Sequence, residues 1–233
     1  MIKNELNCPS KGGKRKKVGI LGGTFDPIHT GHLILAEAAY EAFYLDYVLI
    51  MPNGNPPHKP GQVNATMEQR THMAELAVRD NQHFRVSDFE KTPQDYHYTY
   101  ETLEFLSHEN PDTDYYFILG ADSLVLFHTW KEPRRICECC RILAATRDRM
   151  ETEVLKEHME RLKRELGARI EPLETPNIDI SSNMLRERAQ RGQSIRYYVP
   201  DSVESYIREQ GLYRKNKEEV KLLAEMRNSD ETL

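Results

Sequence analysis

A glycine-rich segment near the start of the chain has the residue types of a phosphate-binding loop. The sequence GGTFDPIHTGH (22–32) follows a short apolar run. Gly22 and Gly23 let a backbone approach a bulky anion and adopt angles that other residues resist. The amides of Thr24 and Phe25 can then point at phosphate oxygens. We therefore predict that this segment binds a phosphorylated ligand.

Two histidines at the end of the segment strengthen that prediction. His29 and His32 are three residues apart, with Gly31 between them. If a helix begins near Gly31, His32 lies in its first turn, where the helix dipole favours an anion, and both imidazoles can face one phosphate chain. Gly31 would then let a nucleobase or a phosphate lie against the backbone. The pattern is neither a Walker A loop nor a G-x-G-x-x-G fingerprint, and the simpler alternative is a turn with two surface histidines.

The segments that must position these residues alternate between strand and helix. Expected strands are 17–21, 47–52, 84–90, 115–120 and 141–146, and expected helices are 31–43, 66–79, 100–108, 150–166 and one that starts at 201. This alternation predicts an α/β fold, a doubly wound (Rossmann-like) parallel sheet with helices on both faces, in a single domain. Such a sheet binds its ligand just past the carboxyl ends of the strands, where segment 22–32 lies.

The ends of the chain differ in composition from its middle. Residues 1–17 are rich in lysine and arginine and are expected to form a flexible basic arm, residues 18–213 the folded domain, and residues 214–233 a charged C-terminal extension. We expect no secretory signal in the arm, which has no apolar core. The role of either end is not readable from the sequence.

Composition excludes several classes of protein. No apolar run approaches the ~20 residues that span a bilayer, and a formal net charge of -5 argues against a protein built around duplex nucleic acid. The four cysteines have no zinc-finger spacing, which favours reduced thiols in a cytoplasmic protein; they are Cys8, Cys137, Cys139 and Cys140. The sequence leaves open whether the chain forms a homo-oligomer.

The first motif also resembles a known signature. G-T-F-D-P-x-H-x-G-H is similar to the signature of the nucleotidyltransferases that share H-x-G-H with class I tRNA synthetases. The remaining motifs resemble bacterial nicotinate-nucleotide adenylyltransferase along essentially all of 18–213. The resemblance implies transfer of the adenylyl group of ATP to nicotinate mononucleotide, giving deamido-NAD and pyrophosphate in NAD biosynthesis. Mg²⁺ is the implied metal, since it neutralises phosphate oxygens in such reactions.

The resemblance assigns phosphate-contacting roles to four residues. They are His29, His32, Lys59 and Arg186. Lys59 ends the proline-rich segment PNGNPPHK (52–59), where paired prolines can hold a cation over the site. Arg186 belongs to ISSNMLRER, which resembles the second family signature. Here Ser181 and Ser182 start a helix, so that hydroxyls, amides and the guanidinium converge on the β- and γ-phosphates.

Further residues are implied in binding the two substrates. Gly22, Gly23, Thr24, Phe25, Asp122, Ser181 and Ser182 are assigned to ATP, and Thr99, Trp130, Lys131 and Arg147 to nicotinate mononucleotide. Trp130 would stack on the pyridine ring, although a Trp of the core is the plain alternative, and Thr99 could serve only as a helix N-cap. No direct side-chain metal ligand is expected, but Asp26 or Asp122 could hold Mg²⁺ through water.

Other functions stay open at this point. The acceptor could be nicotinamide mononucleotide or another phosphate compound, and the choice between acid and amide is not readable from composition. Outside enzymes, the chain could be a catalytically silent nucleotide sensor. The presence of His29, His32, Lys59 and Arg186 argues against silence.

Overall fold

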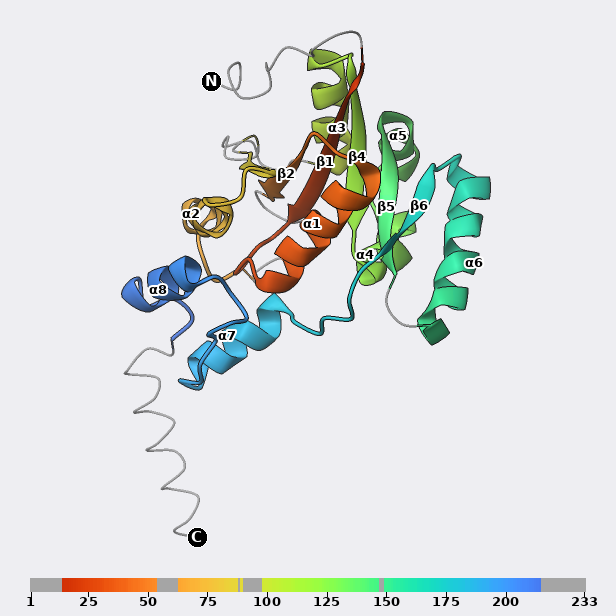
Figure 1. Ribbon diagram of the computed structural model, residues 1–233. Helices are drawn as coiled ribbons and strands as arrows, with labels where there is room; N and C mark the ends of the chain where they lie inside the picture. The colour runs from red at the N-terminus through yellow and green to blue at the C-terminus, as the bar shows by residue number, and fades with distance from the viewer. Residues whose placement is uncertain (1–13, 54–62, 88, 90–97, 147–148, 215–233) are drawn as a thin grey trace.

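The fold is built on one parallel sheet (Figure 1). The computed structural model describes residues 14–53, 63–87, 89, 98–146 and 149–214. Within them, the strands are β1 (Lys16–Gly23), β2 (Tyr47–Pro52), β3 (Phe84–Val86), β4 (Thr113–Leu119), β5 (Cys140–Thr146) and β6 (Ile170–Glu174). They lie in the order β3-β2-β1-β4-β5-β6, and every neighbouring pair is parallel. The predicted doubly wound parallel sheet is confirmed.

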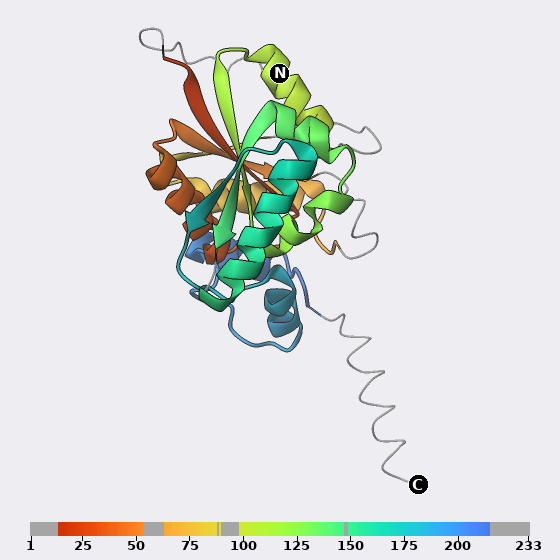
Figure 2. The same ribbon diagram turned by 90° about the vertical axis from the view of Figure 1, so that its right-hand side faces the viewer.

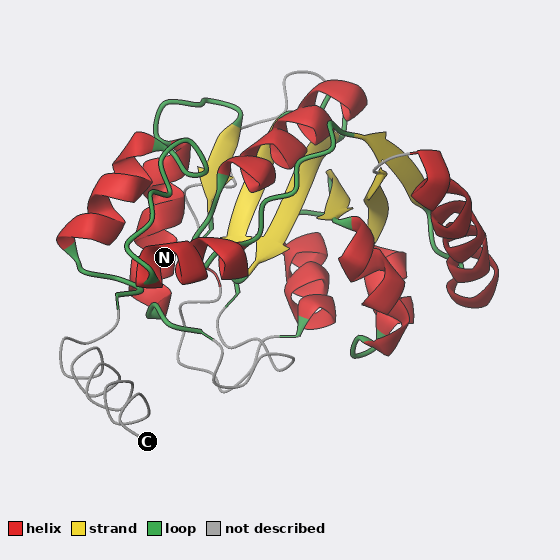
Figure 3. Cartoon of the chain, turned by 90° about the horizontal axis from the view of Figure 1, so that it is seen from below, coloured by secondary structure: helices red, strands yellow, loops and turns green. Residues whose placement is uncertain are grey.

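Two layers of helices cover the sheet, one on each face (Figures 2 and 3). One apolar cluster joins the sheet to α1 (Thr30–Phe43), α2 (Met67–Val78), α7 (Ser182–Gln190) and α8 (Asp201–Glu209). The other joins it to α3 (Thr99–Glu109), α4 (Ala121–Leu126), the 3₁₀ turn η2 (Phe127–Thr129), α5 (Pro133–Cys139) and α6 (Arg149–Leu166). Strand residues alternate between the two clusters: in β4, Tyr116 and Ile118 belong to the first, and Phe117 and Leu119 to the second. None of the helices in the described ranges is long and apolar enough to cross a membrane.

Several boundaries differ from the sequence predictions. β1 begins at Lys16, so the last two residues of the predicted basic arm belong to the sheet, and it continues through Gly22 and Gly23 rather than stopping before them. Both glycines pair with β2, opposite Met51 and Pro52. β3 is shorter than the predicted 84–90 strand, and four elements were not predicted: α4, η2, α5 and β6.

The order of the strands determines where a ligand can lie. The chain moves outward from β1 through β2 to β3, and then returns to the other side of β1 with β4. Connections from β1 and β4 therefore leave toward opposite faces, which opens a crevice at the carboxyl ends of these two strands. In Figures 1 and 2, α7 and α8 lie at this carboxyl edge, beside the first turn of α1. The glycine-rich segment emerges there.

Candidate active site

The two motif histidines lie against each other at the start of α1. Their rings stack with centroids 3.6 Å apart and planes inclined by 25°. His29 is the N-cap residue and His32 the third residue of the helix, which confirms that His32 lies in the first turn. The backbone N–H of His29 donates to Nδ1 of His32 at 3.2 Å. Since that nitrogen accepts, the neutral His32 ring carries its proton on Nε2.

Gly31 has a different role from the predicted one. A Cβ at this position would lie 3.1 Å from Nδ1 and 3.2 Å from Cε1 of His29. The space over Gly31 is thus filled by the imidazole of His29, which is only 5% exposed, and not left for a nucleobase or a phosphate. Gly31 permits the histidine pair to form.

The loop between β1 and α1 is shaped by Phe25 rather than by unusual glycine angles. Phe25 has φ of 49°, in the left-handed region that residues with a Cβ adopt at a cost. Neither Gly22 nor Gly23 is among the residues with positive φ, so the predicted need for glycine angles is wrong. Gly23 is needed for space, because its Cβ would lie 2.8 Å from the Phe25 ring. The Phe25 ring is 2% exposed, and it meets the His32 ring edge to face with centroids 4.9 Å apart. It therefore packs against the histidine pair and restricts the movement of His32.

Asp26 is an internal anchor of the loop and not an exposed carboxylate. Its side chain is 1% exposed and accepts hydrogen bonds from the backbone N–H of Asn64 at 2.8 Å and of Ala65 at 3.2 Å. The hydroxyl of Tyr213 donates to the same carboxylate at 2.7 Å. A buried carboxylate needs such donors. The prediction that Asp26 could hold a metal through water is therefore corrected, because its oxygens are turned into the protein.

The second signature contacts the first through α7. Ser181 is the N-cap, as predicted, and its hydroxyl accepts from the N–H of Met184 at 3.2 Å. Ser182 does not direct its hydroxyl to the open edge but donates to the carbonyl of Pro27 at 2.9 Å. Arg186 donates from Nη1 to the carbonyl of Asp26 at 2.8 Å. Two residues separated from the loop by more than 150 positions therefore hold it just before His29.

Arg70 is a positioning residue that the sequence analysis missed. This residue of α2 is 1% exposed, and its Nη1 donates to the carbonyls of Thr24 at 2.7 Å and Asn53 at 2.8 Å. The guanidinium thus ties the end of β1 to the end of β2. An arginine within a helix gives no sign in the sequence that it points inward, so no motif could have identified it.

Asp122, predicted to contact ATP, and those residues predicted to bind nicotinate mononucleotide that the structure describes follow β3 and β4 rather than β1. Asp122, in the first turn of α4, is exposed, as is Lys131. Trp130 is half-buried, with Phe127 at 5.4 Å and Phe117 at 6.1 Å between ring centroids, so the alternative of packing on the core is realised for part of its ring. Thr99 does not cap α3. Tyr98 is the N-cap, and its N–H donates to Glu101 at 3.2 Å.

Two predicted site residues lie outside the described residues. They are Lys59, in the proline-rich segment, and Arg147, which follows β5.

Comparison with known proteins identifies the family. A family model described as cytidylyltransferase-like matches residues 20–188. A curated protein from Lachnoclostridium phytofermentans, named "Probable nicotinate-nucleotide adenylyltransferase", is 45% identical over 198 residues, which cover 85% of this chain and 99% of the relative. The chain belongs to the nicotinate-nucleotide adenylyltransferase family. A relative of the same name from Synechococcus sp. (strain JA-3-3Ab) is 40% identical over 86% of this chain and 96% of its own length.

Solved structures of adenylyltransferases share the fold. Plasmodium falciparum nicotinic acid mononucleotide adenylyltransferase complexed with NaAD has a TM-score of 0.69 at 18% identity, over 85% of this chain and 97% of that one. The same enzyme complexed with APC has a TM-score of 0.67 at 17% identity. Identities this low support the architecture alone, and they confirm the predicted fold class.

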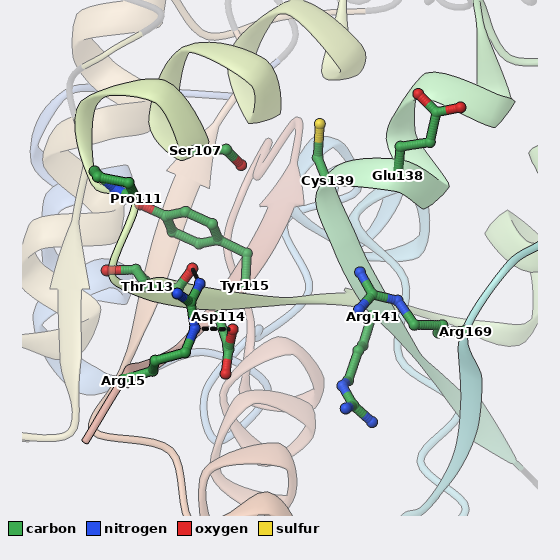
Figure 4. A pocket seen from close by; sticks show the side chains of 10 residues that line it. All are labelled: Arg15, Ser107, Pro111, Thr113, Asp114, Tyr115, Glu138, Cys139, Arg141 and Arg169. Atoms are coloured by element: carbon green, nitrogen blue, oxygen red, sulfur yellow. Dashed lines mark hydrogen bonds and ion pairs between the residues drawn. The ribbon is translucent and has the colours of Figure 1, made fainter. Parts of the chain in front are cut away.

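No protein cage for a metal exists in the part of the adenylyltransferase that the structure describes. No group of three or more His, Cys, Asp or Glu side chains in these ranges could hold a metal ion. A cavity of about 320 Å³ lies at the opposite, amino edge of the sheet, lined by residues that include Arg15, Cys139 and Arg169 (Figure 4). It includes none of the predicted site residues.

Proposed function

We propose that this chain, like the family to which it belongs, transfers the adenylyl group of ATP to nicotinate mononucleotide, releasing pyrophosphate and deamido-NAD. The observation that carries this proposal is the stacked His29–His32 pair, which lies at the carboxyl edge of β1 on a loop held by the second signature helix. A parallel sheet binds nucleotides at this edge. Two imidazoles there can donate to the oxygens of a phosphate chain.

The reaction requires positioning more than activation. A phosphate oxygen of nicotinate mononucleotide attacks the α-phosphorus of ATP, a P–O bond forms, and the bond to the bridging oxygen breaks, so that pyrophosphate leaves with the electron pair. The attacking phosphate is ionised at neutral pH, so no side chain has to remove a proton from it. The protein has to align the two phosphates and stabilise the charge that develops on the oxygens.

The geometry supports a distinct task for each phosphate-contacting residue. The protonated Nε2 of His32 can donate to a phosphate oxygen, while His29 stacks against its ring and fixes its orientation. Arg186 donates to Asp26 and to Asn183 and still has further N–H donors for an anion. Ser181 accepts its capping bond, and its own hydroxyl proton can donate to a phosphate oxygen. Lys59, which lies outside the described residues, is proposed as a further cation.

Mg²⁺ is proposed to bind together with ATP, through its phosphates, rather than in a site formed by protein side chains alone. Magnesium keeps several waters and binds through phosphates and one or two carboxylates, which fits a region without a three-ligand cluster among the described residues. Asp122 is exposed and suits a contact through water, in contrast to the buried Asp26. When bound, the ion neutralises charge on the phosphate oxygens.

The remaining assignments concern acceptor and compartment. We propose that Thr99, Trp130, Lys131 and Arg147 contact nicotinate mononucleotide, with the exposed part of Trp130 available to the pyridine ring. The protein is proposed to work in the cytoplasm, where its free thiols Cys137, Cys139 and Cys140 would stay reduced. No nucleic-acid partner is proposed.

One assay tests the function. Purified chain is incubated with ATP, Mg²⁺ and either nicotinate or nicotinamide mononucleotide, and pyrophosphate release is followed with an enzyme-coupled readout. We expect release with the acid, less with the amide, and none without a mononucleotide or with EDTA. Faster release with the amide would move the assignment to a nicotinamide enzyme. No release with either acceptor would support a silent nucleotide sensor.

A further inference from the structure

The last described turn of the chain reaches back to the first motif. Tyr213 follows α8 and is 8% exposed, and its hydroxyl donates to Oδ1 of Asp26 at 2.7 Å across 187 positions of sequence. Its ring belongs to the same apolar cluster as Phe25 and Ile28, the residues on either side of the Asp26–Pro27 pair. A side chain near the end of the described residues is therefore built into the support of the catalytic loop.

The contact lies at a junction of the network around Asp26. The carboxylate of Asp26 receives two backbone N–H groups, from Asn64 and Ala65, and one hydroxyl, from Tyr213. The carbonyl of the same residue receives Arg186. His29 follows three positions later. Any shift of Asp26 is thus transmitted both to the histidine pair and to the arginine of the second signature, over very few covalent bonds.

The Tyr213 hydroxyl is a permanent donor. Burial, and then the negative charge of Asp26, raise the pKa of Tyr213 far above its usual value. The hydroxyl therefore keeps its proton throughout the pH range of an adenylyltransferase. Removing it takes the 2.7 Å hydrogen bond from Oδ1 and leaves the longer bond from the N–H of Ala65, at 3.2 Å. A buried carboxylate that loses its shortest donor must move or admit water.

We propose that Tyr213 is a positioning residue for adenylyl transfer, which acts through Asp26 to hold His29, His32 and Arg186 in their working arrangement. The inference rests on the proposed function, since it concerns the rate of that reaction. Tyr213 touches no reacting atom. Loss of its hydroxyl is therefore expected to slow the chemical step rather than to weaken substrate binding. A displacement of about 1 Å in that step can cost on the order of a hundredfold in rate.

The test compares two hydroxyl deletions in the full chain. Tyr213→Phe keeps the ring in the core and leaves the backbone preference at φ 62° unchanged. Tyr115→Phe is the matched control, because Tyr115 is 3% exposed and its hydroxyl also donates a buried hydrogen bond, to the carbonyl of Leu106 at 3.2 Å. That bond lies at the amino edge, away from the loop. Both kcat and KM are measured for each substrate, and kcat is divided by the folded fraction from circular dichroism at the assay temperature.

The expected result is a split between the kinetic constants. Tyr213→Phe lowers kcat by about tenfold and changes either KM by less than about twofold, whereas Tyr115→Phe leaves both within about twofold of wild type. Equal kcat values for the two variants, after correction for the folded fraction, overturn the proposal while the wild-type activity stands. A rise in KM with unchanged kcat also overturns it, because that result indicates weaker substrate binding and not a slower chemical step. An inactive wild type overturns the proposed function together with this inference.

Discussion

Gly31→Ala is expected to lower the rate of the reaction while leaving the protein folded. The new Cβ would lie 3.1 Å from Nδ1 and 3.2 Å from Cε1 of His29, so the imidazole must shift by a few tenths of an ångström. Gly31 lies in the first turn of α1, where alanine is the better helix former by up to about 1 kcal/mol. That gain offsets the cost of moving the ring, and we expect the melting temperature to change by no more than about 4 °C.

The rate is more sensitive than the stability. If a misplacement of about 1 Å costs on the order of a hundredfold, a shift of a few tenths of an ångström lowers kcat by about four- to tenfold. The assay is pyrophosphate release at saturating ATP and nicotinate mononucleotide, with melting followed by circular dichroism. An unchanged kcat in the folded variant would refute the reasoning that the orientation of the His29 ring matters.

A second experiment distinguishes two roles for Gly31. The structure indicates that Gly31 makes room for the His29 ring, whereas the sequence predicted that it makes room for a nucleobase or a phosphate. If Gly31 serves His29, then Gly31→Ala has no further effect on kcat in a chain that already carries His29→Ala, because the displaced ring is gone. If instead the Cβ blocks a nucleobase or phosphate at Gly31, the loss persists in the double variant. Persistence would restore the role for Gly31 that the structure replaces.

Three other outcomes are expected, two for residues of the site and one for the apolar cluster on the opposite face of the sheet. His32→Ala should lower kcat by about a hundredfold or more with the circular dichroism spectrum unchanged, since it removes a donor to the phosphates; unchanged turnover would remove His32 from the site. Arg70→Met should reduce the free energy of unfolding in urea by about 3 kcal/mol, because two loop carbonyls lose a buried charged donor, and a loss below about 1 kcal/mol would contradict its anchoring role. Burial raises the pKa of Cys137 to about 11 and raises those of Cys140 and Tyr115 as well. The folded chain therefore keeps protons that the unfolded chain loses above pH of about 8.5. The urea midpoint under reducing conditions should fall as the pH rises from about 8.5 toward 11, and a midpoint that rises over this range would contradict this.

Local patterns predicted elements well where they were long or carried a cap. The capping box of Thr66 and Gln69 starts α2 as expected, with both reciprocal bonds formed at 3.3 and 2.9 Å. Short polar elements were missed. α5 has only Pro133 in its first turn as a signal, and β6 contains Pro172, which an edge strand tolerates but a central strand does not.

The sequence predicted the site features that depend on residues within one helical turn. These are the pairing of His29 with His32 and the N-cap at Ser181. Contacts over long separations were not predicted. Whether Asp26 faces a metal or the interior depends on Tyr213, Asn64 and Arg186 reaching it from three other parts of the chain, and no local pattern encodes which way a carboxylate turns. Only the packed tertiary structure makes that choice, since a buried charge is stable only where distant donors converge on it.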